Sequence, residues 1–428
     1  MRDRILQILV VAIFCASSAY VQSEIPENEY SDVVDYKRYL RIAVGNHPEI
    51  QFQYLEIEKS SADIREAKSQ RLPSVSIGGG LSDVNQKNSN YGITLPIFTF
   101  NKISSQIDLN SEKKKLEEYE LIEVINRIAL DLTATFQKYK SVTQRIHAYE
   151  IAQVQLSKMY KRIKRRADIG FDSQGDLFSI ESKQMKNQAA INSLLVELED
   201  IKKEISSYYG SPIEELAPLP ENYFEISIDD EFPILLENQN PRLLIANQKI
   251  IISERQKKVN RANELPTLEA YKNGYNRDIL NTPNDQGFRF SYRLDNLGVS
   301  ALANDRKAEL EIKSSREELR RTHLEIQIEL DRIDSSLRNT SIRQQEQKNI
   351  FNTLTSIKES YLRQYEVGLK SINEVLNVDS EIIEARLSLI REKEEEELNK
   401  AKLYALIGGF YSAIESDAFP DHLEMISK

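Results

Sequence analysis

The sequence predicts a mainly α-helical fold with a small β part, built from two internal repeats. Asn46-His47-Pro48 is matched by Asn240-Pro241, with the two prolines 193 positions apart. Gly170-Phe171-Asp172-Ser173 is matched by Gly368-Leu369-Lys370-Ser371, 198 positions further on. Sequence similarity at a nearly fixed offset indicates a supersecondary unit that occurs twice. Each copy reads as a helix, two short strands, a long helix, a turn and a second long helix.

The first 23 residues resemble an export signal. Arg2 and Arg4 precede an apolar run from Ile5 to Ala16 that is too short to span a bilayer. Val21-Gln22-Ser23 supplies small residues for cleavage, and cleavage after Ala19 is the alternative. We therefore expect a signal peptide over 1–23 and an exported mature chain.

Composition excludes several classes of protein. Cys15 is the single cysteine and lies in the expected signal peptide, so the mature chain is expected to form no disulfide. The net charge of -10 argues against a nucleic-acid partner. Charged residues make up 29% of the chain and there are only 14 glycines, which suits long helices.

No motif indicates catalysis. The four histidines are scattered, without a partner at metal-ligand spacing. The sequence contains no nucleophile elbow, phosphate loop or dinucleotide fingerprint. We expect no enzyme activity, no catalytic residue, no cofactor and no metal.

The first repeat is expected over 24–212. Pro48 interrupts its first helix and Pro73 ends it, because the residue before a proline avoids the helical region. Neither proline nor glycine interrupts the following long helix, which is about 100 Å long at 1.5 Å per residue. The expected elements are a helix over 35–70, strands over 74–80 and 91–100, and long helices over 101–169 and 174–209.

The second repeat is expected over 240–414, after a Pro-rich connector over 213–239 and before a C-terminal tail over 415–428. Gly368 separates its two long helices, as Gly170 does in the first repeat. The expected elements are strands over 267–275 and 287–294 and long helices over 301–367 and 372–406.

The long helices carry a narrow apolar seam. Ile326, Leu330, Ile333 and Leu337 step by 4, 3 and 4 residues, as in a coiled coil. A seam this narrow buries little against one neighbour. The helices are therefore expected to form antiparallel pairs that need further pairs beside them.

The last predicted strand alternates between apolar and polar residues. Phe288, Phe290, Tyr292 and Leu294 fall on one face, and Arg289, Ser291 and Arg293 on the other. This pattern fits a barrel wall with a lipid face and a wet lumen, and it also fits a soluble sheet with one buried face. Export and the long helices favour the barrel. Four strands leave two open edges that lipid cannot satisfy, so a barrel requires strands from other copies.

A family resemblance rests on Asn46-His47-Pro48 with Leu72-Pro73-Ser74, on Leu95-Pro96-Ile97-Phe98, and on Asn240-Pro241 with Leu265-Pro266. The most specific segment runs from Tyr365 to Ile372, followed by Glu374-Val375-Leu376. With these segments the chain resembles the TolC-like outer membrane efflux proteins over 30–415.

The resemblance implies a homotrimer with a 12-stranded β-barrel in the outer membrane of a Gram-negative bacterium, on an α-helical barrel in the periplasm. It implies an exit duct without catalysis, used in efflux or type I secretion. The implied partners are a periplasmic adaptor and an inner-membrane RND or ABC transporter. The rival interpretation is an exported periplasmic coiled-coil scaffold or adaptor without a channel.

The resemblance also implies a periplasmic gate at the helix tips. By position, Asp176 matches the acidic partner, Tyr365 the tyrosine, Lys370 a basic position and Glu374 an acidic ring. The alternative is that all four are solvated residues beside turns. The basic run Lys161 to Arg166 is expected to be a solvated helix end, with adaptor contact as the minority option.

Two strand-to-helix junctions depart from the family pattern. Phe98-Thr99-Phe100-Asn101 lacks the usual glycines. Arg293-Leu294-Asp295-Asn296-Leu297-Gly298 stands where a proline-containing turn is usual.

Overall fold

A computed structural model describes residues 33–34, 36–81, 87–210, 212, 215–216, 223–224, 226, 228, 232–277, 285–292 and 299–416. The expected signal peptide, about half of the connector and nearly all of the C-terminal tail lie outside these residues. The departure predicted over 293–298 lies outside them too.

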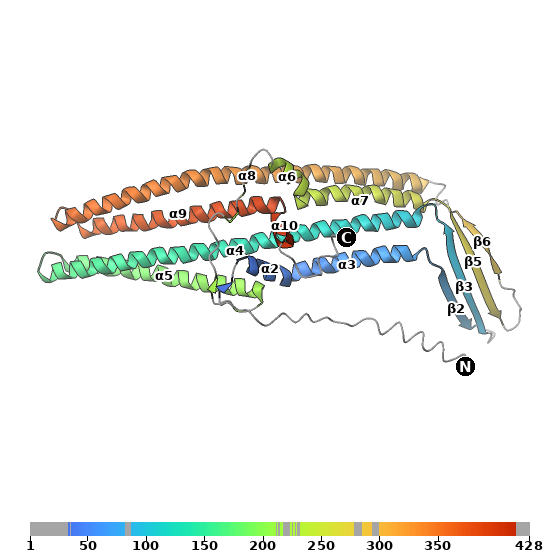
Figure 1. Cartoon of the computed structure of the whole chain (residues 1–428), viewed down its shortest axis with the longest axis horizontal. Helices are drawn as coiled ribbons and strands as arrows, with labels where there is room; N and C mark the ends of the chain where they lie inside the picture. The colour runs from blue at the N-terminus through green and yellow to red at the C-terminus, as the bar shows by residue number, and fades with distance from the viewer. Residues whose placement is uncertain are drawn as a thin grey trace.

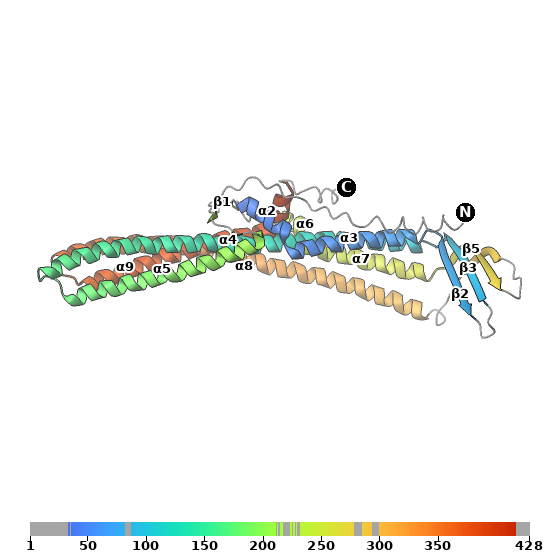
Figure 2. The ribbon, with the colours of Figure 1, turned by 90° about the horizontal axis from the view of Figure 1, so that it is seen from below.

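The molecule is long and narrow, with helices along its axis and a small sheet at one end (Figures 1 and 2). The helices are α2 (Tyr36–Asn46), α3 (Pro48–Ser69), α4 (Lys102–Asp168), α5 (Gln174–Tyr209), α6 (Phe232–Gln239), α7 (Pro241–Asn263), α8 (Val299–Glu366), α9 (Ile372–Leu406) and α10 (Gly409–Ser416). The strands are β1 (Val33–Val34), β2 (Ser74–Leu81), β3 (Lys87–Phe98), β4 (Glu215–Leu216), β5 (Thr267–Arg277) and β6 (Asp285–Ser291). The predicted fold class, mainly helical with a small β part, is confirmed. Within the described residues no helix is both long and apolar enough to cross a membrane.

Two helices, α4 and α8, run through both halves of the molecule (Figure 1). Near the sheet, α3 packs on α4, α4 on α7, and α7 on α8. In the other half, α5 packs on α4, α4 on α9, and α9 on α8. The main contacts thus place the helices side by side, with α8 at one edge and α3 and α5 at the other. Long, thin layers of this kind leave edge helices without a neighbour on one side.

The core of the molecule lies where the two halves meet. Tyr36 and Phe136 are fully buried there and pack edge to face at 5.3 Å. The Tyr36 hydroxyl shares a 2.6 Å hydrogen bond with Thr133 Oγ1. Phe224, from the Pro-rich connector, packs against Phe410 of α10 at 5.6 Å. The connector therefore contributes to the middle of the molecule.

The predicted apolar seam on α8 is only partly buried. Ile326, Leu330 and Ile333 are buried in one cluster with Leu403 and Leu406 of α9. Further along α8, Ile350 begins a second run with the same steps, through Leu354, Ile357 and Tyr361, and it is exposed. One side of α8 is therefore covered by α9, and another side remains apolar and uncovered by the described chain.

The repeat is visible in how α3 and α7 begin. Both helices have proline at the first turn, with His47 and Asn240 as the capping residues. Asn240 Oδ1 accepts from the Leu243 backbone N–H at 3.1 Å, which satisfies a free donor of the first turn. Asn240 Nδ2 donates to the Leu406 carbonyl at 2.7 Å and so also binds the end of α9.

The sheet is antiparallel, in the order β2-β3-β5-β6. Directly paired residues share a face, so the register assigns the described side chains to one face or the other. The apolar face carries Val75, Ile77, Tyr91, Ile93, Leu95, Phe288 and Phe290, all of them exposed. The opposite face carries Ser74, Ser76, Thr94, Glu269, Arg289 and Ser291. The predicted alternation is confirmed, and the alternative of a soluble sheet with one buried face is wrong for the described chain, because Ile77 is 85% exposed and Phe288 75%.

The end of β3 explains the first unusual junction. Phe100 and Asn101 have φ angles of 45° and 67°, in the left-handed region. Glycine adopts that region without steric cost, and asparagine tolerates it better than most residues. The junction therefore keeps a glycine-type backbone without glycine. The strand ends at Phe98 and not at the predicted residue 100, because the left-handed turn at Phe100 and Asn101 leads the chain out of the sheet and into α4.

We predict that Asn240→Ala destabilises the protein by about 1–3 kcal/mol, because it removes a helix cap and leaves the buried Leu406 carbonyl unpaired. The midpoint of thermal unfolding in detergent measures this. Asn352→Ala, on the exposed side of α8, is the matched control and should leave the midpoint unchanged. Equal midpoints for the two variants would contradict the role of Asn240.

Candidate functional site at the helical tip

The two helical hairpins, α4–α5 and α8–α9, both turn at the end of the molecule opposite the sheet (Figures 1 and 2). Gly170 and Gly368 have φ angles of 82° and 78°. Phe171 N–H donates to the Arg166 carbonyl at 2.9 Å, and Leu369 N–H donates to the Gln364 carbonyl at 2.8 Å. This is a Schellman motif, which requires a left-handed residue and therefore favours glycine. The repeat thus builds the same turn twice.

Each turn leads into a capping box. The Ser173 side chain accepts from the Asp176 backbone N–H at 3.1 Å, and the Asp176 carboxylate accepts from the Ser173 backbone N–H at 3.0 Å. Ser371 and Glu374 repeat the arrangement at 3.4 and 2.9 Å. Reciprocal bonds of this kind satisfy free donors of the first helical turn. They also fix both carboxylates beside the turns.

The two hairpins are joined by a contact that centres on Asp172. The Tyr365 hydroxyl of α8 donates to the Asp172 carboxylate of the first turn. Arg166 Nε of α4 donates to the same carboxylate oxygen at 2.9 Å, and the Asp172 side chain is only 6% exposed. The Arg166 guanidinium also lies over the Tyr365 ring, 4.9 Å from its centre. A buried carboxylate with two donors from different hairpins holds those hairpins together.

The protonation states suit this contact. Burial, reinforced by the hydrogen bond to Asp172, raises the pKa of Tyr365, so the hydroxyl remains a donor at neutral pH. The hydrogen bond to Asp172 raises the pKa of Arg166 further above its ordinary value. A second cross-hairpin ion pair joins Arg162 to Glu366 and is more exposed. Exposed pairs contribute about 0–1 kcal/mol each, so the buried Asp172 contact is the stronger of the two.

Lys370 and Glu374 pair within the second hairpin. Lys370 Nζ lies 2.5 Å from Glu374 Oε1 and 4.5 Å from the centre of the Tyr361 ring. The hydrogen bond from Lys370, followed by the one from the Ser371 backbone, lowers the pKa of Glu374. Glu374 is therefore charged at neutral pH, and on the acid side this contact is lost when the pH falls through its lowered pKa.

An apolar cluster supports the tip from within. Its buried members come from all four helices: Leu156, Ile163, Leu177, Ile180, Tyr365, Ile372, Val375 and Leu376. Burial of these apolar side chains favours association of the two hairpins but does not select one arrangement, because the hydrophobic effect is not directional. The polar contacts at Asp172 provide the fixed geometry.

All four residues expected at the gate lie at this tip, but they are not paired as the resemblance implies. The acidic partner of Tyr365 in this chain is Asp172, whereas the Asp176 carboxylate caps α5. The sequence did contain a signal for Asp172. In the repeat it stands at the position of Lys370, so the two turns match in shape and differ in charge.

The expectation that the basic run from Lys161 to Arg166 is a solvated helix end is wrong for Arg166. Its side chain is 25% exposed, pairs with Asp172 of the same hairpin and lies over the Tyr365 ring of the other hairpin. Arg162 pairs with Glu366 of the other hairpin while half of its side chain stays exposed. Nothing in the spacing of the run identifies the contacts with the other hairpin.

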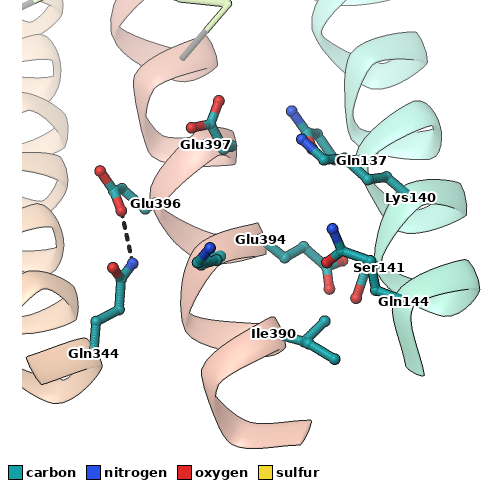
Figure 3. A pocket seen from close by; sticks show the side chains of 10 residues that line it. Gln137, Lys140, Ser141, Gln144, Gln344, Ile390, Glu394, Glu396 and Glu397 are labelled. Atoms are coloured by element: carbon teal, nitrogen blue, oxygen red, sulfur yellow. Dashed lines mark hydrogen bonds between the residues drawn. The ribbon is translucent and has the colours of Figure 1, made fainter. Parts of the chain in front are cut away.

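A small cavity lies between α4 and α9, well away from the tip (Figure 3). Its volume is about 100 Å³, and its lining mixes carboxylates, amides and lysines. Gln137 Nε2, Ser141 Oγ and Glu397 Oε2 are buried there without a partner among the described protein atoms. A polar cavity of this size accommodates water. Among the described residues no group of three or more His, Cys, Asp or Glu side chains is placed to hold a metal ion.

Comparison with known proteins agrees with this geometry. The outer membrane efflux protein family matches residues 40–210, which is most of the first repeat. The predicted resemblance to the TolC-like outer membrane efflux proteins is confirmed. The comparison with curated proteins gives no match.

Solved membrane proteins share the fold of this chain over most of its length. VceC, an outer membrane protein from the bacterial pathogen Vibrio cholerae, has a TM-score of 0.73 at 14% identity, over 88% of this chain and 96% of VceC. The CmeC outer membrane channel of Campylobacter jejuni has a TM-score of 0.70 at 13% identity, over 89% of each chain. CusC, described in terms of transmembrane channel formation, has a TM-score of 0.75 at 15% identity, over 90% of this chain and 96% of CusC. The matched family is one of efflux proteins, and at 13–15% identity these structures show that the chain shares their fold.

Proposed function

We propose that three copies of this chain form an exit duct that crosses the outer membrane and the periplasm of a Gram-negative bacterium. The observation that carries the proposal is the four-stranded sheet at the end of a long helical layer. Its apolar face is exposed, and of the described strands β2 and β6 each have a partner on one side only. Open edges cannot persist in lipid, because every backbone polar group there needs a partner.

Closure with other copies satisfies these edges. The β6 edge of one chain pairs with the β2 edge of the next, and three chains supply twelve strands, enough for a barrel with a water-filled interior. The polar face, with Arg289 and Glu269, then lines the interior, and the apolar face contacts lipid.

The edge helices support the same assembly. On α5, Phe178, Met185 and Val196 are exposed, and on α3 Phe52 and Leu55 are exposed. At the opposite edge, α8 exposes Leu310, Leu324, Ile328, Ile342 and Ile350. Adjacent copies place these two sets of apolar side chains against each other and remove them from water. Helical barrel and β-barrel then close with the same symmetry.

The helical tip serves as the gate in this proposal. The contact of Tyr365 and Arg166 with Asp172 holds the second hairpin against the first. Asp176, Lys370 and Glu374 surround the same turns, and in three copies they place charge around the entrance. A few such contacts suffice to close the tip and remain weak enough for a partner to release it.

The proposed partners are a periplasmic adaptor and an inner-membrane RND or ABC transporter, in efflux or type I secretion. The tip offers an apolar contact surface for the adaptor, because Ile169, Phe171, Val367 and Leu369 are each about 70% exposed or more. The rival function, a periplasmic scaffold, leaves the exposed apolar face of the sheet without a role.

We predict that Ile77→Arg prevents assembly in the outer membrane, whereas Ser76→Arg does not. The two residues are neighbours on β2 and face opposite sides of the sheet. Arginine on the lipid face costs about 2–4 kcal/mol near the bilayer centre and far less in a wet lumen. Membrane fractionation of both variants measures this. A soluble periplasmic pool of the unaltered protein would favour the scaffold instead.

We predict that Asp172→Asn raises the conductance of the protein in planar bilayers, because it weakens the bonds from both Tyr365 and Arg166. Asp168→Asn is the matched control, since Asp168 is an exposed carboxylate in the last turn of α4. Its conductance should equal that of the unaltered protein. If neither variant conducts more, the gate is not at Asp172, while the barrel assignment stands.

A further inference from the structure

Beyond the tip, a second set of polar contacts joins all four helices in a closed ring. We name it the polar girdle, and its members are Gln155 and Tyr160 of α4, Glu181 and Lys183 of α5, Lys358 of α8, and Asp379 and Ser380 of α9. None of these residues was singled out by the sequence.

The contacts run from helix to helix without a break. Tyr160 donates to Glu181 Oε1 at 3.0 Å, which joins α4 to α5. Lys183 donates to Ser380 Oγ, which joins α5 to α9. Lys358 Nζ lies 2.5 Å from Asp379 Oδ1, which joins α8 to α9. Lys358 also donates to Gln155 Oε1 at 2.9 Å, which joins α8 back to α4.

The girdle lies further from the turns than the Asp172 contact. Lys358 precedes Tyr365 by seven residues on α8, and Asp379 follows Ile372 by seven on α9. Each interval corresponds to about 10 Å along a helix. The apolar cluster of the tip fills the space between. The two sets of contacts therefore hold the hairpins at two separate levels.

The repeat shows what is special about the second hairpin. Tyr160 and Glu181 stand 198 positions before Lys358 and Asp379, so the first hairpin has a neutral donor where the second has an ion pair. The side chains of Lys358 and Asp379 are 16% and 9% exposed. Removing one partner of a buried pair leaves the other charge uncompensated, which is far more costly than losing an exposed pair.

We propose that Lys358, oriented by Asp379, is a second lock on the gate, which holds the second hairpin to the first independently of Asp172. This rests on the proposed function, because it assumes that the hairpins separate when the duct opens. Release of the Tyr365–Asp172 contact frees only the turns. Full opening also requires Lys358 to leave Gln155, and Lys183 to leave Ser380. Lys358 and Asp379 are thus positioning residues for the gate.

The test compares Asp172→Asn, Asp379→Asn and the combination of both in planar bilayers. Each single variant should conduct more than the unaltered protein. The open probability of the double variant should be about tenfold or more above that of either single variant. A tenfold change requires only a small part of the free energy that is lost when a buried ion pair is broken. Hydrogen exchange of the full chain in detergent is a second measurement. The exchange rate of the backbone amides should rise over 372–380 in Asp379→Asn, and only around the turns in Asp172→Asn.

A transplanted pair controls for simple unfolding of the hairpin. Lys358→Tyr with Asp379→Glu copies the Tyr160–Glu181 pair into the second hairpin, so it keeps α8 bonded to α9 and loses the bond to Gln155. This variant should conduct like Asp379→Asn while exchange over 372–380 stays low. If it remains closed, the lock between hairpins is wrong, and Asp379 only stabilises its own hairpin. If Asp172→Asn alone gives full opening, the second lock is also wrong. Absence of conductance in every protein, the unaltered one included, would instead remove the proposed duct.

Discussion

The structure depends on one constraint: a single chain exposes strand edges and apolar side chains that its own described residues do not cover. Of the described strands, β2 and β6 are open at the sheet edges, and Ile77 and Phe288 expose an apolar face. Backbone groups at such edges need partners in lipid, and apolar faces need cover in water. In the proposed trimer, neighbouring copies supply both, and the apolar sides of α5 and α8 are covered by the same step.

Much of this architecture could be predicted from the sequence, because local chemistry sets it. Pro48 and Pro241 start α3 and α7, and Gly170 and Gly368 allow the left-handed turn that ends the long helices. The alternation of apolar and polar residues, such as Phe288 and Arg289, predicted which side chains lie on each face of the sheet. Phe100 shows the limit of such rules, since it adopts a glycine-type backbone that its side chain does not favour.

The pairing at the tip could not be predicted, because it joins residues that are far apart in the chain. Tyr365 contacts Asp172 across 193 positions, and Arg162 contacts Glu366 across 204. Position in a family pattern selected Asp176, four residues from the carboxylate that Tyr365 contacts in the single chain. Only the packing of two hairpins decides which carboxylate meets the tyrosine. The repeat makes the two hairpins similar in shape, but their charges differ and are complementary. Arg162 of α4 pairs with Glu366 of α8, and Arg166 of α4 lies over the Tyr365 ring of α8.

The central claim is that a single chain forms one third of a tube wall. The most direct measurement is the mass of the purified protein in detergent by native mass spectrometry, combined with end-on images of the same particles. The account predicts particles of three chains that enclose a hollow centre. Stable single chains, or compact particles without a central opening, would contradict it.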